Sequence, residues 1–112
     1  MPSKQPDRRL RDIIQSIDRI VGFTNGMEFE AFMADERTRL AVERCLLIIS
    51  EAVVKLGRDV EALSPEIPWH QIRGLGNWLR HDDDQIDHRM LWSAITNELP
   101  RLRAACAKQL ER

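Results

Sequence analysis

The sequence predicts an all-α protein, an up-down helical bundle of four to five main helices in a single domain over residues 1 to 112. Aromatic residues make up only 5% of the chain, whereas leucine, isoleucine, alanine, arginine and glutamate are plentiful, which is typical of helices. Apolar residues recur at intervals of three and four, in segments separated by glycine, proline and asparagine. A chain of 112 residues that is 43% hydrophobic can build one core.

The first predicted helix follows Pro6 and ends at the breaker Thr24-Asn25-Gly26. A short helical piece over residues 27 to 33 comes next. Asp35 then offers a side-chain oxygen for the N-terminus of the longest helix, predicted over residues 36 to 56. The core face of the first helix is formed by Leu10, Ile13, Ile14, Ile17, Ile20 and Val21.

The helix predicted over residues 36 to 56 is apolar on two sides, and a helix that is hydrophobic around most of its circumference is buried around most of it. Neighbouring helices of so small a bundle cover only part of that surface, so we expect a subunit interface. The alternative is a central helix in a monomer. The inward side comprises Val42, Cys45, Leu46, Ile49, Ala52, Val53 and Leu56, and the second side comprises Leu40, Leu47, Ile48 and Val54.

A breaker over residues 64 to 68 separates the two halves of the chain, because each of its prolines disfavours helical geometry in the preceding residue. The next helix is predicted over residues 69 to 81, followed by a polar turn over residues 82 to 86. Asp87 caps a further helix, which Pro100 is expected to kink or restart. The core face of this helix is formed by Met90, Leu91, Ala94, Ile95 and Leu99.

Charge and composition exclude several classes of function. Seventeen Lys+Arg against 18 Asp+Glu give a net charge of -1, so phosphate binding has to be local. Cys45 and Cys106 lie among apolar residues with no nearby Cys or His, which predicts buried, reduced thiols rather than a metal site. No apolar run approaches the ~20 residues of a membrane span, and no signal peptide is recognisable, so we expect a cytoplasmic protein without a cofactor.

The helix predicted over residues 69 to 81 separates polar from apolar side chains. At ~100° per residue, its polar residues share one side of the helix, opposite Ile72, Leu75, Trp78 and Leu79. The polar residues are Arg73, Asn77, Arg80 and His81.

Two glycines in this helix require an explanation, because each costs about 1 kcal/mol relative to alanine. Gly74 and Gly76 flank the polar side, which places both outside the core face. Glycine at such positions permits the close approach of a phosphate-bearing chain or of a second subunit. The alternative is tight helix packing alone.

The end of this helix has the residue types for acid-base chemistry on phosphate. The ordinary pKa of histidine, ~6.5, suits His81 for proton transfer, and nearby arginines suit the charge of a phosphorane, so metal-free cleavage of RNA through its 2′-hydroxyl is chemically feasible. A capping or ion-paired histidine is the alternative. Asp82, Asp83 and Asp84 are of the type that binds cations, but three aspartates after a helix more often form a solvated turn, and we expect no metal.

Several separated stretches of the chain together resemble one known family. They are Arg11-Asp12-Ile13, Ala41-Val42-Glu43-Arg44, Ile49-Ser50-Glu51-Ala52, Ile67 through Asn77, Leu79-Arg80-His81 and Asp87 through Pro100. In this order they resemble the HepT-like family of the HEPN superfamily, over about residues 8 to 105. The resemblance implies a HEPN-like helical domain that forms homodimers and, as a toxin, cleaves RNA without a metal in a groove at the dimer interface. It implies a minimal nucleotidyltransferase antitoxin as partner.

The chain departs from the family's ribonuclease motif at two positions. The motif is an arginine, four to six residues and a histidine, often followed two positions later by a tyrosine that the partner adenylylates. With His81 as the histidine, the arginine window holds Gly74, Leu75 and Gly76, and the tyrosine position holds Asp83. The whole chain contains no tyrosine, so tyrosine adenylylation cannot regulate it.

Two functions remain open at this point. In the first, the chain is a HepT-like toxin and metal-independent ribonuclease, with His81 as general acid or base and Asn77 orienting the groove. Arg73 and Arg80 then steady the phosphate. In the second, the chain is a nuclease-inactive helical dimer that serves as the partner or substrate-binding subunit of a minimal nucleotidyltransferase.

Overall fold

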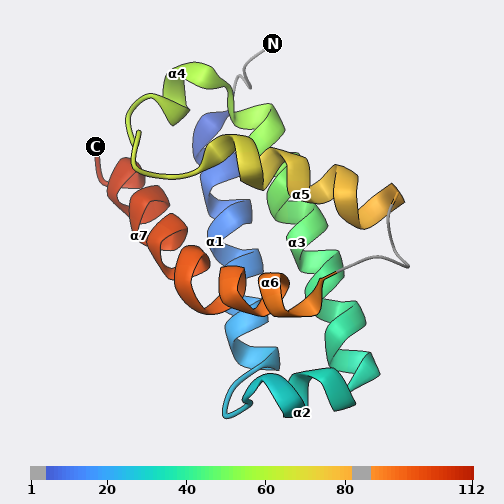
Figure 1. Cartoon of the computed structure of the whole chain (residues 1–112). Helices are drawn as coiled ribbons and strands as arrows, with labels where there is room; N and C mark the ends of the chain where they lie inside the picture. Colours follow the sequence, from blue (N-terminus) through green and yellow to red (C-terminus); the bar gives the residue numbers. More distant parts are fainter. Residues whose placement is uncertain (1–4, 82–86) are drawn as a thin grey trace.

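In this computed structural model, the residues described are 5–81, of which residue 81 by its backbone only, and 87–112. All regular secondary structure among them is helical, which confirms the predicted all-α class (Figure 1). No helix in these two segments combines the length and the apolar character needed to cross a bilayer. The long helices are α1 (Pro6–Phe23), α3 (Glu36–Leu56), α5 (Trp69–His81) and α7 (Leu99–Leu110), and the short ones are α2 (Phe29–Ala34), α4 (Arg58–Glu61) and α6 (His88–Ser93).

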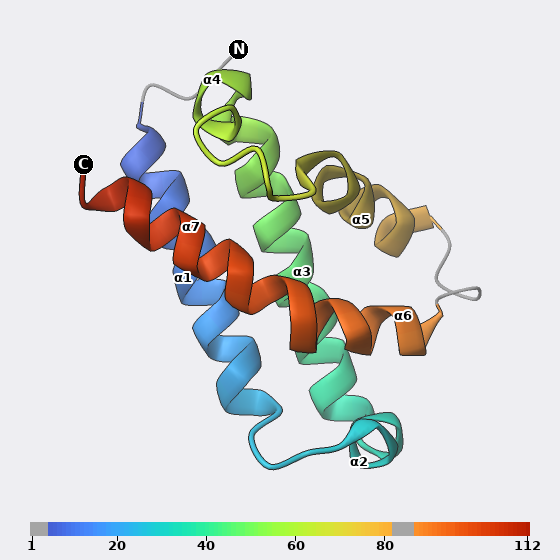
Figure 2. The same cartoon turned by 60° about the vertical axis from the view of Figure 1, so that its left-hand side comes forward.

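Helices α1 and α3 run antiparallel and side by side, and α7 crosses α1 on the opposite flank from α3 (Figures 1 and 2). The reversal after α1 follows the predicted breaker. Thr24 closes the helix because its N–H (3.0 Å) and its hydroxyl (2.8 Å) both donate to the carbonyl of Ile20. Gly26 then adopts φ 76°, a left-handed conformation that glycine tolerates without strain.

Helix α3 begins at its predicted cap and buries its predicted inward side. The Asp35 carboxylate accepts hydrogen bonds from the backbone N–H (3.0 Å) and the hydroxyl (2.8 Å) of Thr38. All seven residues of the inward side are buried. On the second apolar side, Leu40 and Val54 are each 58% exposed. Leu47 and Ile48, on the same side, are partly buried, so this side is covered only in part within one chain.

A short helix that the sequence analysis did not predict, α4, lies between α3 and α5. Gly57, with φ 95°, ends α3 and starts α4. The segment that follows is tied down by Ser64: its carbonyl accepts from the indole N–H of Trp69 (2.9 Å), and its hydroxyl bonds the amide of Gln109 on α7 (2.9 Å). These bonds set where α5 starts.

Helices α6 and α7 are joined by a π-helix, Ala94–Glu98. Asp87 caps α6 as predicted, accepting from the backbone N–H groups of Arg89 (3.0 Å) and Met90 (3.2 Å). Pro100 has no N–H, and its ring clashes with the carbonyl four residues earlier in an α-helix, so the backbone widens before it. This π-helix is the interruption that the sequence predicted at Pro100.

Both cysteines are buried and unpaired, as predicted. Burial raises the pKa of the Cys106 thiol to about 12. Burial also raises the pKa of Cys45, although Arg19 and Arg44 act in the opposite direction. Both thiols are therefore protonated at neutral pH and serve as small core side chains.

Candidate active-site helix

One side chain of α3, Ser50, forms hydrogen bonds with the backbone of α5 at two points. The Ser50 hydroxyl donates to the backbone carbonyl of Arg73 (3.0 Å) and accepts from the backbone N–H of Gly76 (3.2 Å). A Cβ atom at position 76 would lie 2.4 Å from the Ser50 Oγ and 2.9 Å from its Cβ. Only glycine fits at this contact.

The expectation that both glycines lie outside the core face is therefore wrong for Gly76. Gly76 is buried between α5 and α3, and its lack of a side chain is explained by helix packing. The expectation was wrong because Ser50, on a distant segment, brings the backbone of α5 unusually close to α3. Gly74 is exposed, and nothing would lie within 4 Å of a Cβ there.

Arg73 is directed away from the end of α5. Its guanidinium forms an ion pair with the carboxylate of Glu61 on α4, and only 18% of the Arg73 side chain and 9% of the Glu61 side chain are exposed. A guanidinium in a mostly buried pair is held by its partner. Arg73 thus links α5 to α4.

The Arg80 guanidinium lies beside Gly76. Its Nη1 atom is 3.7 Å from the position that a Cβ of residue 76 would occupy. Nη1 is also 3.8 Å from the Glu51 carboxylate, in a pair whose two side chains are each about half exposed. Because this ion pair is long and half exposed, the Arg80 guanidinium is accessible to an anion.

Asn77 and Arg80 lie on the exposed side of α5. The guanidinium of Arg73 lies instead against Glu61 on α4. His81 is the last residue of α5 and directly follows Arg80. The side chain of His81 lies outside the described residues, as do Asp82, Asp83 and Asp84. The predicted set of Arg73, Asn77, Arg80 and His81 remains a prediction.

A groove of about 600 Å³ lies on the other flank of α5, between it and α3, α6 and the π-helix. Its walls are mostly apolar, with a few polar groups such as Gln71, Ser93 and Glu98. A mostly apolar groove with a few polar groups is typical of a ligand-binding surface. The groove was not predicted from the sequence, because several of the side chains that line it were expected in the core. The apolar walls include Leu46, Ile49, Leu75, Trp78, Leu91 and Ala94.

Among the side chains of residues 5–80 and 87–112, no three of His, Cys, Asp or Glu cluster closely enough to hold a metal ion.

Comparison with known proteins identifies the family. The profile described as "Ribonuclease HepT-like" matches residues 13–108. The chain belongs to the ribonuclease HepT-like family. It is 36% identical to "Probable ribonuclease HepT" of Thermococcus cleftensis over 88% of this chain and 90% of that protein. It is 33% identical to "Putative RNase MJ1216" of Methanocaldococcus jannaschii over 92% of this chain and 85% of that protein. No solved structure matches the chain significantly.

Membership in the HepT-like family confirms the resemblance and makes the Gly76 contact informative. Position 76 lies in the window where the family motif has its arginine, and here Ser50 closes that position to any side chain. The guanidinium nearest to the position belongs to Arg80.

Substituting the two glycines by alanine is expected to have opposite effects. For Gly76→Ala, the overlap with Ser50 costs about 1–3 kcal/mol and helix propensity returns about 1, so the free energy of unfolding falls by up to roughly 2 kcal/mol. For Gly74→Ala, only the propensity acts, and the free energy of unfolding rises by up to about 1 kcal/mol. Urea denaturation followed by circular dichroism measures both. Equal effects at the two positions would contradict the Ser50 contact.

Neutralising Glu61 is expected to destabilise the fold. Glu61→Gln leaves the Arg73 guanidinium mostly buried without its counter-charge, so the free energy of unfolding falls by about 3 kcal/mol. The matched control is Glu98→Gln, which removes the charge from a pair with Arg101 whose side chains are 40% and 53% exposed. That change costs less than about 1 kcal/mol. If both variants unfold at the same denaturant concentration as the wild type, Arg73 is not held as described.

Proposed function

We propose that this protein is the toxin component of a HepT and minimal nucleotidyltransferase pair, and that it cleaves RNA as a homodimer without a metal ion. Family membership supports ribonuclease chemistry. The observation that carries the assignment to this chain is the Arg80 guanidinium, which lies beside Gly76 and so replaces the motif arginine from the following turn of α5.

The reaction follows from the chemistry of RNA. The 2′-oxygen attacks the adjacent phosphorus and the bond from phosphorus to the 5′-oxygen breaks, leaving a 2′,3′-cyclic phosphate and a 5′-hydroxyl. His81 takes the proton of the 2′-hydroxyl or gives one to the departing 5′-oxygen. Arg80 stabilises the charge that grows on the phosphoryl oxygens. Asn77, one turn earlier, orients the phosphate through its side-chain amide.

Arg73 acts as a positioning residue in this proposal. Its ion pair with Glu61 and the Ser50 bonds to its carbonyl and to Gly76 fix α5 at two of its faces. Arg80 and Asn77 are thereby presented from a rigid helix, which suits groups that have to be in place before the reaction.

A homodimer is supported by the partly uncovered side of α3. Leu40, Leu47 and Val54 recur at intervals of seven, the spacing of a helix-helix seam, and Leu40 and Val54 are each 58% exposed. Glu51, which pairs with Arg80, lies on α3 between Leu47 and Val54. A second copy packed on this seam would therefore lie next to Arg80, and the two α5 helices would flank one groove.

The proposed partner is a nucleotidyltransferase antitoxin. Because the chain has no tyrosine, silencing by tyrosine adenylylation is excluded, and the antitoxin has to act by contact or through another residue.

A second function is favoured by the same contact that closes position 76. If Arg80 does not serve as the catalytic arginine, the chain is a nuclease-inactive dimer that binds the nucleotidyltransferase or presents its substrate. The mostly buried pair of Arg73 with Glu61 is consistent with this function too, because it keeps the Arg73 guanidinium away from an RNA phosphate.

Cleavage tests the first function directly. The purified chain, incubated with labelled single-stranded RNA and a chelator, is expected to produce 2′,3′-cyclic phosphate ends, and a strand lacking 2′-hydroxyls stays intact. His81→Ala and Arg80→Ala should each lower the rate on the order of 100-fold or more. Arg101→Ala, an exposed arginine on α7, is the matched control and keeps full activity. Negligible cleavage by the wild type, together with co-purification of the nucleotidyltransferase, would establish the second function instead.

Sedimentation tests the dimer. The wild type is expected to sediment as a dimer at micromolar concentration, and Leu40→Glu/Val54→Glu as a monomer with unchanged helical circular dichroism, because each glutamate places a charge in the apolar seam. Leu63→Glu, at an exposed leucine outside α3, should remain dimeric. A monomeric wild type would contradict the interface.

A further inference from the structure

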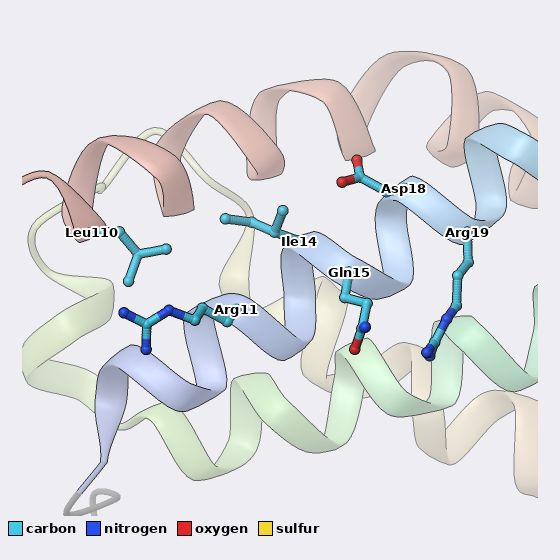
Figure 3. Close-up of a pocket in the computed structure, with 6 residues that line it drawn as sticks. All are labelled: Arg11, Ile14, Gln15, Asp18, Arg19 and Leu110. Atoms are coloured by element: carbon cyan, nitrogen blue, oxygen red, sulfur yellow. The ribbon is translucent and has the colours of Figure 1, made fainter.

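The outer side of α1 carries a row of hydrogen-bond donors. Arg11, Gln15 and Arg19 follow one another at intervals of four, so they lie along one exposed stripe of the helix (Figure 3). With Ile14 and Leu110 they line a hollow of about 560 Å³ between α1 and the end of α7. Asp18 is the one acid among the lining residues.

The acids of α1 next to this row are already paired. The Asp18 carboxylate accepts two hydrogen bonds from the Arg103 guanidinium, at 2.7 and 3.1 Å, and the bond to Arg103 lowers the pKa of Asp18. Asp12 lies 3.6 Å from Arg9. Within the described part of the chain, neither Arg11 nor Arg19 forms an ion pair. The row therefore presents uncompensated positive charge.

A third arginine extends this charge onto α3. Arg44 is on α3, the helix that packs beside α1, and both Arg19 and Arg44 act to lower the pKa of the Cys45 thiol on that helix. Arg44 is exposed, as is Arg19. In a chain of net charge -1, three arginines in this arrangement form a local cationic surface.

We infer that the row formed by Arg11, Gln15 and Arg19 is a second RNA-binding site, which contacts the phosphodiester backbone away from α5. The choice of RNA as ligand rests on the proposed ribonuclease function. Eight residues of helix place the two arginines ~12 Å apart along the axis. At ~3.4 Å per nucleotide of a stacked strand, this distance spans roughly three to four nucleotides.

The side chains of the row suit a backbone better than a single anion. Each guanidinium binds one phosphate through two donors, and the Gln15 amide donates between them. Ile14 and Leu110 form an apolar floor on which a ribose or a base can lie. No base edge is read, so binding is independent of sequence.

The location of the row makes the site dependent on RNA length. Helices α1 and α5 both pack on α3, from different sides (Figures 1 and 2). A strand that contacts Arg80 has to extend around the bundle to reach Arg19. A short oligonucleotide bound at α5 does not use the row.

Binding of a 2′-O-methyl single strand tests the site, because this strand cannot be cleaved and the result does not depend on nuclease activity. Fluorescence anisotropy with a labelled strand of 20 or more nucleotides is measured over a series of salt concentrations. Arg11→Ala/Arg19→Ala is expected to weaken binding roughly tenfold at low salt and to lower the slope of log K against log salt by about 1.4, since each lost phosphate contact removes ~0.7. Arg58→Ala/Arg101→Ala, with the same change of charge at exposed positions on α4 and α7, should leave the slope unchanged.

A variant with higher affinity for RNA provides a second test. Asp18→Asn removes the acid from the hollow and releases Arg103, so binding should become tighter. Equal affinity and slope for the wild type and Arg11→Ala/Arg19→Ala would overturn the inference, whether or not the protein cleaves RNA. An equal loss in both double variants would overturn it too, because binding would then follow total charge. An absence of RNA cleavage, with the expected pattern of binding, would overturn the proposed nuclease and leave the site in place.

Discussion

The position of α5 depends on the two hydrogen bonds of Ser50. One hydroxyl bonds both Arg73 and Gly76, and this is feasible because the backbone of α5 lies almost in contact with α3. A neutral hydrogen bond contributes only about 1 kcal/mol, so its effect is mainly geometric. It sets the distance between the helices, and that distance explains why position 76 is glycine.

Two arginines on the same side of α5 have different surroundings, because burial differs along the helix. Near its start, α4 covers the helix, and Glu61 holds Arg73 in a mostly buried pair. Near its end, α4 is absent, and among residues 5–80 and 87–112 the ion-pair partner of Arg80 is Glu51, at 3.8 Å in a half-exposed pair. A charge in the first environment contributes to stability, and a charge in the second is available to a ligand.

The fold was largely predictable from the sequence, because spacing and caps act locally. Two residues predicted for core faces were wrong: Val21 is 57% exposed and Met90 is 66% exposed. The bounds of α3 and α5 and the caps Asp35 and Asp87 agree with the structure. The four residues of α4 are too few to show a period, so neither this helix nor the partner of Arg73 could be predicted. The role of Gly76 was misjudged because a helical wheel describes one helix and contains no information on Ser50, 26 residues away. The assignment of Arg80 as a candidate came from the sequence, but its place beside Gly76 required the fold.

The π-helix between α6 and α7 keeps the buried side chains of these two helices on the same side. The buried residues Leu91, Ile95 and Leu99 are separated by two successive intervals of four. In an α-helix, eight residues turn ~80° too far to return to the same side. The wider turn over residues 94 to 98 removes part of that excess, so α6 and α7 both direct apolar side chains inward. The widened turn thus keeps Leu91 and Leu99 more nearly in line than two intervals of four would leave them in a regular α-helix.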